Sequence, residues 1–79
     1  MNNTEYNRLL QLKNRISSNE ASIEEKKEYM TILYNNGNIT KEQYNRFLLE
    51  KNSEDIVKAG LTIGGFILAV WLLSKLTDK

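Results

Sequence analysis

The sequence predicts an all-α protein in which a small helical part is followed by a single C-terminal transmembrane helix. Three observations predict this class. The 79-residue chain contains no proline, which suits helices joined by glycine and cap residues. Apolar residues before position 53 recur at spacings of three and four, as on one face of a helix. Residues 59–74 carry no charge and would extend roughly 24 Å as a helix, close to the roughly 30 Å of a bilayer core.

A first helix is predicted over residues 5–16, with Thr4 as its N-cap. Leu9, Leu12 and Ile16 lie three and four residues apart and therefore share one face. This spacing predicts a single apolar stripe that packs on the rest of the helical part.

A second helix is predicted over residues 23–36, where Ser22 and Glu25 have the spacing of a capping box. Met30, Leu33 and Tyr34 fall on its apolar face. The charged residues 24–28 cover the other side, and we expect them to be solvated rather than to form an acid/base pair.

A third helix is predicted over residues 41–51, after a tight turn. Gly37 can adopt the left-handed conformation that ends the second helix. Thr40 and Gln43 form a second capping box. Tyr44 and Phe47 then face the second helix at helical spacing, and we expect them to belong to the core of a helical hairpin.

The turn also carries a family resemblance. The motif of Gly37, Ile39, Thr40, Glu42, Gln43 and Tyr44 resembles the pattern Gly-x-Ile-Thr-x-Glu-Glu-Phe/Tyr of the short C-terminal domain (SHOCT) family. Residues 28–51 are covered, with glutamine in place of the second glutamate. The resemblance implies a helical hairpin that serves in interaction or oligomerisation and has no catalytic residues.

The last helix is predicted over residues 54–76, capped at residues 52–55 and followed by a short polar tail at residues 77–79. A buried or interfacial helix in a larger assembly is the alternative to a membrane span. For a span, the sequence predicts interface anchors and a face of small residues on which a second membrane helix can pack closely. The anchors are Lys58, Trp71 and Lys75, and the packing face contains Gly60, Gly64, Gly65 and Ala69.

Composition excludes several kinds of chemistry. The chain has no histidine and no cysteine, so disulfides, thiolate or imidazole catalysis and zinc sites of these ligands are excluded. An EF-hand loop aligned on Gly37 would place Ile32, Tyr34 and Gln43 at ligand positions, which lack carboxylates. A net charge of +1 leaves no footprint for nucleic acid. We expect no enzyme, no cofactor, no metal and no small-molecule substrate.

These features predict a non-enzymatic, tail-anchored membrane protein. Its partners would be the lipid bilayer and either a protein or a second copy, with residues 1–53 as the interaction region on the cytoplasmic side. Two alternatives remain open, namely a small phage or bacterial holin-like protein that permeabilises membranes, and an accessory subunit of a membrane complex or virion. The candidate interaction face consists of Leu9, Leu12, Ile16, Met30, Leu33, Tyr34, Tyr44 and Phe47.

Overall fold

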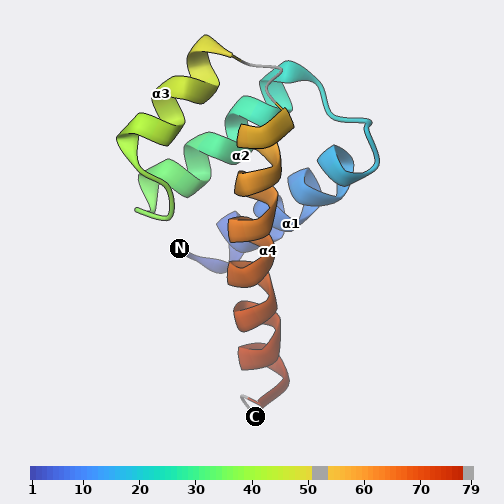
Figure 1. Cartoon of the computed structure of the whole chain (residues 1–79). Coiled ribbons are helices and arrows are strands. Elements are labelled where there is room, and N and C mark those ends of the chain that lie inside the picture. Colours follow the sequence, from blue (N-terminus) through green and yellow to red (C-terminus); the bar gives the residue numbers. More distant parts are fainter. Residues whose placement is uncertain (51–53, 78–79) are drawn as a thin grey trace.

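Four α-helices make up the described part of the chain (Figure 1). The computed structural model describes residues 1–50 and 54–77, and no strand occurs among them. The helices are α1 (Asn3–Ser17), α2 (Ile23–Asn35), α3 (Lys41–Leu49) and α4 (Glu54–Thr77). The predicted all-α class, with one long apolar helix at the C-terminal end, is therefore confirmed.

The start of α1 differs from the prediction. Asn2, rather than Thr4, is the N-cap, because its Oδ1 accepts a hydrogen bond of 2.8 Å from the backbone N–H of Glu5. This bond satisfies one of the free amide groups of the first turn. The choice of Thr4 was wrong because an asparagine two residues earlier caps at least as well, and Thr4 becomes part of the helix.

The two predicted capping boxes are confirmed. Ser22 accepts from the N–H of Glu25 while the Glu25 carboxylate accepts from the N–H of Ser22. Thr40 and Gln43 form the same reciprocal pair at the start of α3. These bonds fix where α2 and α3 begin.

The helix ends depart slightly from the predicted limits. Gly37 has a φ of +72°, the left-handed conformation expected after α2. The third helix ends at Leu49, with Glu50 as its C-cap, two residues earlier than predicted. The predicted cap at Asn52 and Ser53 lies outside the described residues.

The helices pack so that α4 lies against all three others. Figure 1 shows α2 and α3 as a hairpin beside the first turns of α4, and α1 on another side of α4. The last turns of α4 extend beyond the other helices toward the C-terminus. The N-terminal end of α4 is thus part of a helical bundle, and its C-terminal end protrudes from it.

One hydrophobic core joins the four helices. Leu9, Leu12, Tyr29, Leu33 and Phe47 are fully buried, and burying each such side chain contributes about 1.5–3 kcal/mol. The apolar stripe predicted on α1, Leu9, Leu12 and Ile16, is therefore buried in this core. The helix α4 adds four hydrophobic side chains to the same cluster, Ile56, Val57, Leu68 and Trp71.

Candidate functional site

The helix α4 is the candidate site, because its length and composition set it apart from the other helices. It has 24 residues, and its most apolar 18-residue window has a mean hydropathy of 2.0. At 1.5 Å per residue the helix is about 36 Å long. This is long and apolar enough to cross a membrane. The core helix of a bundle can be equally long and apolar. A core helix is mostly buried, whereas a helix that contacts lipid leaves apolar side chains exposed on its surface. Only 28% of its most apolar window is buried inside the protein.

One face of α4 is covered by α2, and two glycines allow the close approach. A Cβ on Gly64 would collide with the phenol of Tyr29, with 2.8 Å to its Cζ. A Cβ on Gly60 would lie 2.6 Å from Sδ of Met30. The predicted small-residue face is thus occupied here by α2 of the same chain at Gly60 and Gly64. Its other members lie elsewhere, with Gly65 half-buried near Lys13 and Ala69 exposed.

Tyr29 is the side chain that fills this glycine notch. It is fully buried, and its hydroxyl donates a 2.9 Å hydrogen bond to the backbone carbonyl of Gly60. Burial raises the pKa of Tyr29, because a phenolate would lose its hydration there. The sequence analysis missed this residue. Its position four residues before Leu33 could have revealed it, but it directly follows the charged residues 24–28.

Trp71 is held by α1 at the other end of the covered face. Its ring stacks on Tyr6 with centroids 4.8 Å apart, and its Nε1 donates a 3.2 Å hydrogen bond to Oδ1 of Asn3. The ammonium of Lys75 lies 4.5 Å from the centroid of the Trp71 ring, within the range of a cation–π contact. Two of the three predicted anchors are therefore adjacent, while Lys58 is exposed near the start of α4.

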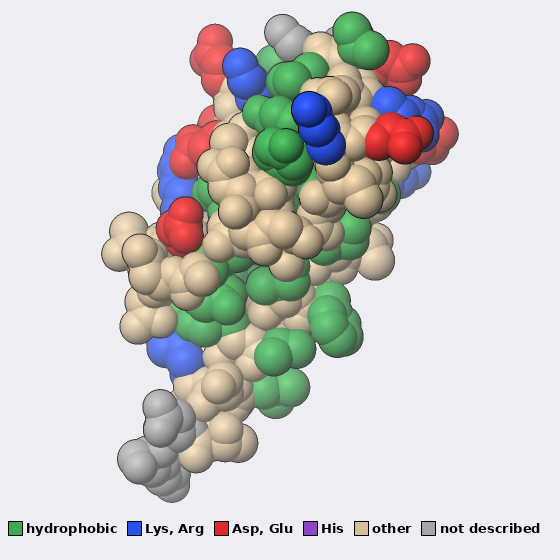
Figure 2. All heavy atoms as spheres, turned by 90° about the vertical axis from the view of Figure 1, so that its left-hand side faces the viewer, with side chains coloured by type: hydrophobic (Ala, Val, Ile, Leu, Met, Phe, Trp, Pro, Cys, Tyr) green, Lys and Arg blue, Asp and Glu red, His purple; other side chains and the backbone are tan. Residues whose placement is uncertain are grey.

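The opposite face of α4 is apolar and uncovered. Phe66, Val70 and Leu73 follow one another at spacings of four and three, and they are 73%, 53% and 61% exposed. Leu72 and Leu76 are also exposed. Figure 2 shows hydrophobic side chains on the surface along the protruding C-terminal part of the molecule. Contiguous exposed apolar surface of this kind marks contact with a membrane or another protein.

The eight residues predicted as an interaction face contribute mainly to packing within the bundle. Six of them are buried in the core, namely Leu9, Leu12, Ile16, Met30, Leu33 and Phe47. The remaining two, Tyr34 and Tyr44, are half-buried and stack on each other with centroids 4.7 Å apart. The hairpin of α2 and α3 is therefore closed by an aromatic pair, as expected for helices that share a core.

Two ion pairs join α1 to α2. Arg8 contacts the Glu28 carboxylate through Nε and Nη2, at 2.6 and 2.8 Å. Arg15 Nε lies 2.6 Å from Oε2 of Glu25. The Arg8 guanidinium holds the pKa of Glu28 below its usual range, and the Ser22 N–H together with Arg15 does the same for Glu25. These two carboxylates stay partly exposed, but their pairing with α1 was not predicted from the sequence.

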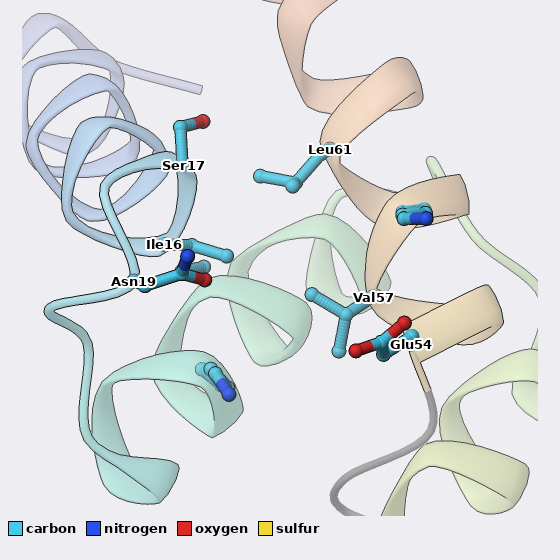
Figure 3. A pocket seen from close by; sticks show the side chains of 8 residues that line it. Ile16, Ser17, Asn19, Glu54, Val57 and Leu61 are labelled. Carbon is cyan, nitrogen blue, oxygen red and sulfur yellow. The ribbon is translucent and has the colours of Figure 1, made fainter.

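A depression of about 350 Å³ lies where α1, α2 and α4 diverge (Figure 3). Ile16, Ser17 and Asn19 project from α1 and the turn after it, and Val57 and Leu61 face them from α4. Lys26, Lys58 and Glu54 complete the lining. In the described part of the chain, no three His, Cys, Asp or Glu side chains gather closely enough to hold a metal.

Comparison with known proteins finds no matching family model, no matching curated protein and no matching solved structure. The resemblance of residues 28–51 to the short C-terminal domain family therefore stays a prediction.

Proposed function

We propose that this chain is a non-enzymatic, single-span membrane protein. In this proposal α4 crosses the bilayer, and the helical N-terminal part lies in the cytoplasm, where it binds a protein partner or a second copy. The observation that carries the proposal is the uncovered apolar face of α4, with Phe66, Val70 and Leu73 exposed along a helix of 24 residues.

Lipid is a suitable environment for this face. Apolar side chains such as leucine and phenylalanine favour the centre of a membrane helix by about 0.3–0.6 kcal/mol each, whereas in water they remain hydrated. The segment between Lys58 and Lys75 carries no charge. These two lysines are about 26 Å apart along the helix, so their side chains can extend to the headgroups on either side.

The interaction role rests on the apolar stripes of the other helices. Leu9, Leu12 and Ile16 on α1 are buried at present because α4 and α2 cover them. If α4 were surrounded by lipid, this stripe would need another cover, since a core of three short helices is small. A protein partner or a second copy could supply it.

The first test places a charge on the uncovered face. Phe66 lies near the middle of α4 and is 73% exposed, so Phe66→Lys should change the stability of the packed bundle by less than about 0.5 kcal/mol. In a bilayer the same lysine costs about 3 kcal/mol. We expect carbonate extraction to release the variant from membranes while the wild-type chain stays in the pellet. Protease added to intact inside-out vesicles should digest the N-terminal part of the wild type.

The matched control is Asn45→Lys on the exposed surface of α3, which adds the same charge away from α4. It should stay in the pellet. Release of the wild-type chain, or equal retention of Phe66→Lys, would overturn the span. Dye leakage from cells after induction is measured in parallel. Leakage on expression of the wild-type chain but not of Phe66→Lys would favour the membrane-permeabilising alternative.

A further inference from the structure

The helix α1 runs antiparallel to α4 and covers it over most of its length. At one end Asn3 and Tyr6 contact Trp71. In the middle, a Cβ on Gly65 would lie 3.2 Å from Cε of Lys13. At the other end Ile16 and Ser17 face Val57 and Leu61 across the depression in Figure 3. The contact surface therefore extends along about four turns of α4.

This packing cannot be kept inside a bilayer. Lys13 lies beside Gly65, the midpoint of α4, so a spanning α4 that kept α1 attached would place this lysine near the bilayer centre. Arg8 and Arg15 flank it on the same helix. A charged side chain at this depth costs about 2.5–3.5 kcal/mol or more. The outer surface of α1 adds the exposed polar residues Asn7, Gln11 and Asn14.

The helix α2 presents the same conflict. Tyr29 reaches α4 at Gly60 and Gly64, and Glu25 and Glu28, on the adjoining part of α2, are paired with α1. If α2 followed α4 into lipid, these carboxylates would follow as well. The packed state of α4 and a membrane-spanning state therefore exclude each other.

We propose that α1 is a releasable cover, and that α4 enters the bilayer only after α1 has separated from it. This inference rests on the proposed function, because it concerns how the span of that function is reached. The uncovered face, with Phe66, Val70 and Leu73, is free to meet the membrane first. The covered face, with Gly60, Gly64 and Trp71, becomes available when the bundle opens.

Opening and insertion are then linked equilibria. The chain inserts in proportion to the fraction of molecules in which α1 is released, so a constraint that holds α1 on α4 lowers insertion without altering the lipid-facing residues. The cover also explains how an apolar helix of this length is kept from non-specific association before it reaches a membrane. The residues covered in this way include Gly60, Gly64, Leu68 and Trp71, which are buried against the rest of the chain.

A reversible cross-link tests the inference. The chain has no cysteine of its own, so the pair Asn3→Cys and Ser74→Cys can be joined by a short, reducible bis-maleimide linker. Both positions line one depression beside Trp71 and Lys75. The matched control pair is Thr31→Cys and Tyr44→Cys, whose native hydroxyls lie 2.9 Å apart and which ties α2 to α3 without tying α1 to α4.

The readout is Trp71, the sole tryptophan, whose fluorescence is quenched by brominated phosphatidylcholine when the ring enters vesicles made of that lipid. We expect the α1–α4 cross-link to reduce quenching more than tenfold, and reduction of the linker in the same sample to restore it. The α2–α3 cross-link should leave quenching unchanged.

Each outcome has one meaning. Undiminished quenching in the α1–α4 cross-linked protein would overturn the cover and leave the proposed span intact. Equal inhibition by both cross-links would also overturn it, because general rigidity rather than release of α1 would then limit insertion. Absence of quenching in the uncross-linked wild-type chain would overturn the proposed span and the cover with it.

Discussion

The two faces of α4 both lack charge over residues 59–74 and differ in their surroundings. Gly60, Gly64 and Trp71 lie against α1 and α2, where small residues and specific hydrogen bonds determine the fit. Phe66 and Leu73 lie on the other side, with no such fit. Shape thus constrains one face, and polarity alone constrains the other.

Because of this difference, substitutions on the two faces of α4 should affect different properties. A change of volume on the covered face acts on the bundle, because packed interiors tolerate neither cavities nor overlaps. A change of polarity on the uncovered face acts on membrane binding, as with Phe66→Lys above. The two kinds of effect should therefore separate between the two faces.

The largest effect on folding is expected for Gly64→Ala. The added Cβ would lie 2.8 Å from Cζ of Tyr29 and collide with its hydroxyl. Tyr29 is fully buried, so its ring cannot turn into solvent without losing that burial. Overpacking of this kind costs about 1–3 kcal/mol. We expect urea unfolding, followed by circular dichroism, to give a loss of about 2 kcal/mol.

Gly65→Ala is the matched control, one residue away. Its Cβ would meet the flexible end of Lys13 at 3.2 Å, so the gain of about 0.5–1 kcal/mol from replacing a helical glycine should prevail. In vesicles both alanines are expected to insert at least as well as glycine. Equal stability of the two variants would show that Tyr29 does not fill the notch in solution.

The contrast between these glycines also shows how far the sequence could predict the site. Gly60 and Gly64 are spaced for close approach of another helix, but spacing does not say which helix approaches. The large residue that fits them, Tyr29, is 31 positions from Gly60 and follows a charged run. No local signal connects the two segments, so this contact could be found only from the packed structure.

Local features were predictable because their causes lie within a few residues. The capping boxes at Ser22 and Thr40 and the left-handed Gly37 depend on neighbours three or four positions away, and the structure has them. The stripe of Leu9 and Leu12 was predicted as buried, since periodicity identifies an apolar face. Periodicity does not identify the partner of that face, and the antiparallel contact of α1 with α4 was therefore not predicted.

A smaller effect is expected when the notch keeps its shape and loses its hydrogen bond. Tyr29→Phe removes the hydroxyl that donates to the Gly60 carbonyl, at a cost of about 1 kcal/mol at neutral pH. Because burial raises the pKa of Tyr29 in the folded state, the unfolded chain loses this proton first as the pH rises above about 10. Wild-type stability should then fall by up to about 1.4 kcal/mol per pH unit from this group.

Tyr29→Phe has no phenol to lose a proton, so its stability should not fall with pH in this way. The difference in unfolding free energy between wild type and Tyr29→Phe should therefore shrink above about pH 10 and change sign near pH 11. Urea titrations of both proteins between neutral pH and that range measure it. Tyr44→Phe is the control, since Tyr44 is half-buried and its hydroxyl lies 2.9 Å from that of Thr31 on α2 rather than on α4. A difference that stayed constant with pH would place Tyr29 in contact with water.

The smallest effect is expected at the ion pairs that hold α1 on α2 rather than on α4. Glu28→Gln replaces the carboxylate bound by Arg8. The Glu28 side chain is 42% exposed, and exposed ion pairs contribute little to stability because water screens them. The Arg8 guanidinium lowers the pKa of Glu28, so its contribution is present above the ordinary carboxyl pKa and disappears as the pH falls through the lowered folded value. The small difference from wild type should therefore vanish in acid. The control Glu24→Gln, on the exposed side of α2, should show no difference in stability from wild type at any pH.

A small loss of stability for Glu28→Gln beside a large one for Gly64→Ala would mean that apolar fit, rather than charge, retains α4 in the bundle. Contact with lipid would then be a stronger trigger for release of α1 than acidification. An effect of Glu28→Gln as large as that of Gly64→Ala would reverse this ranking.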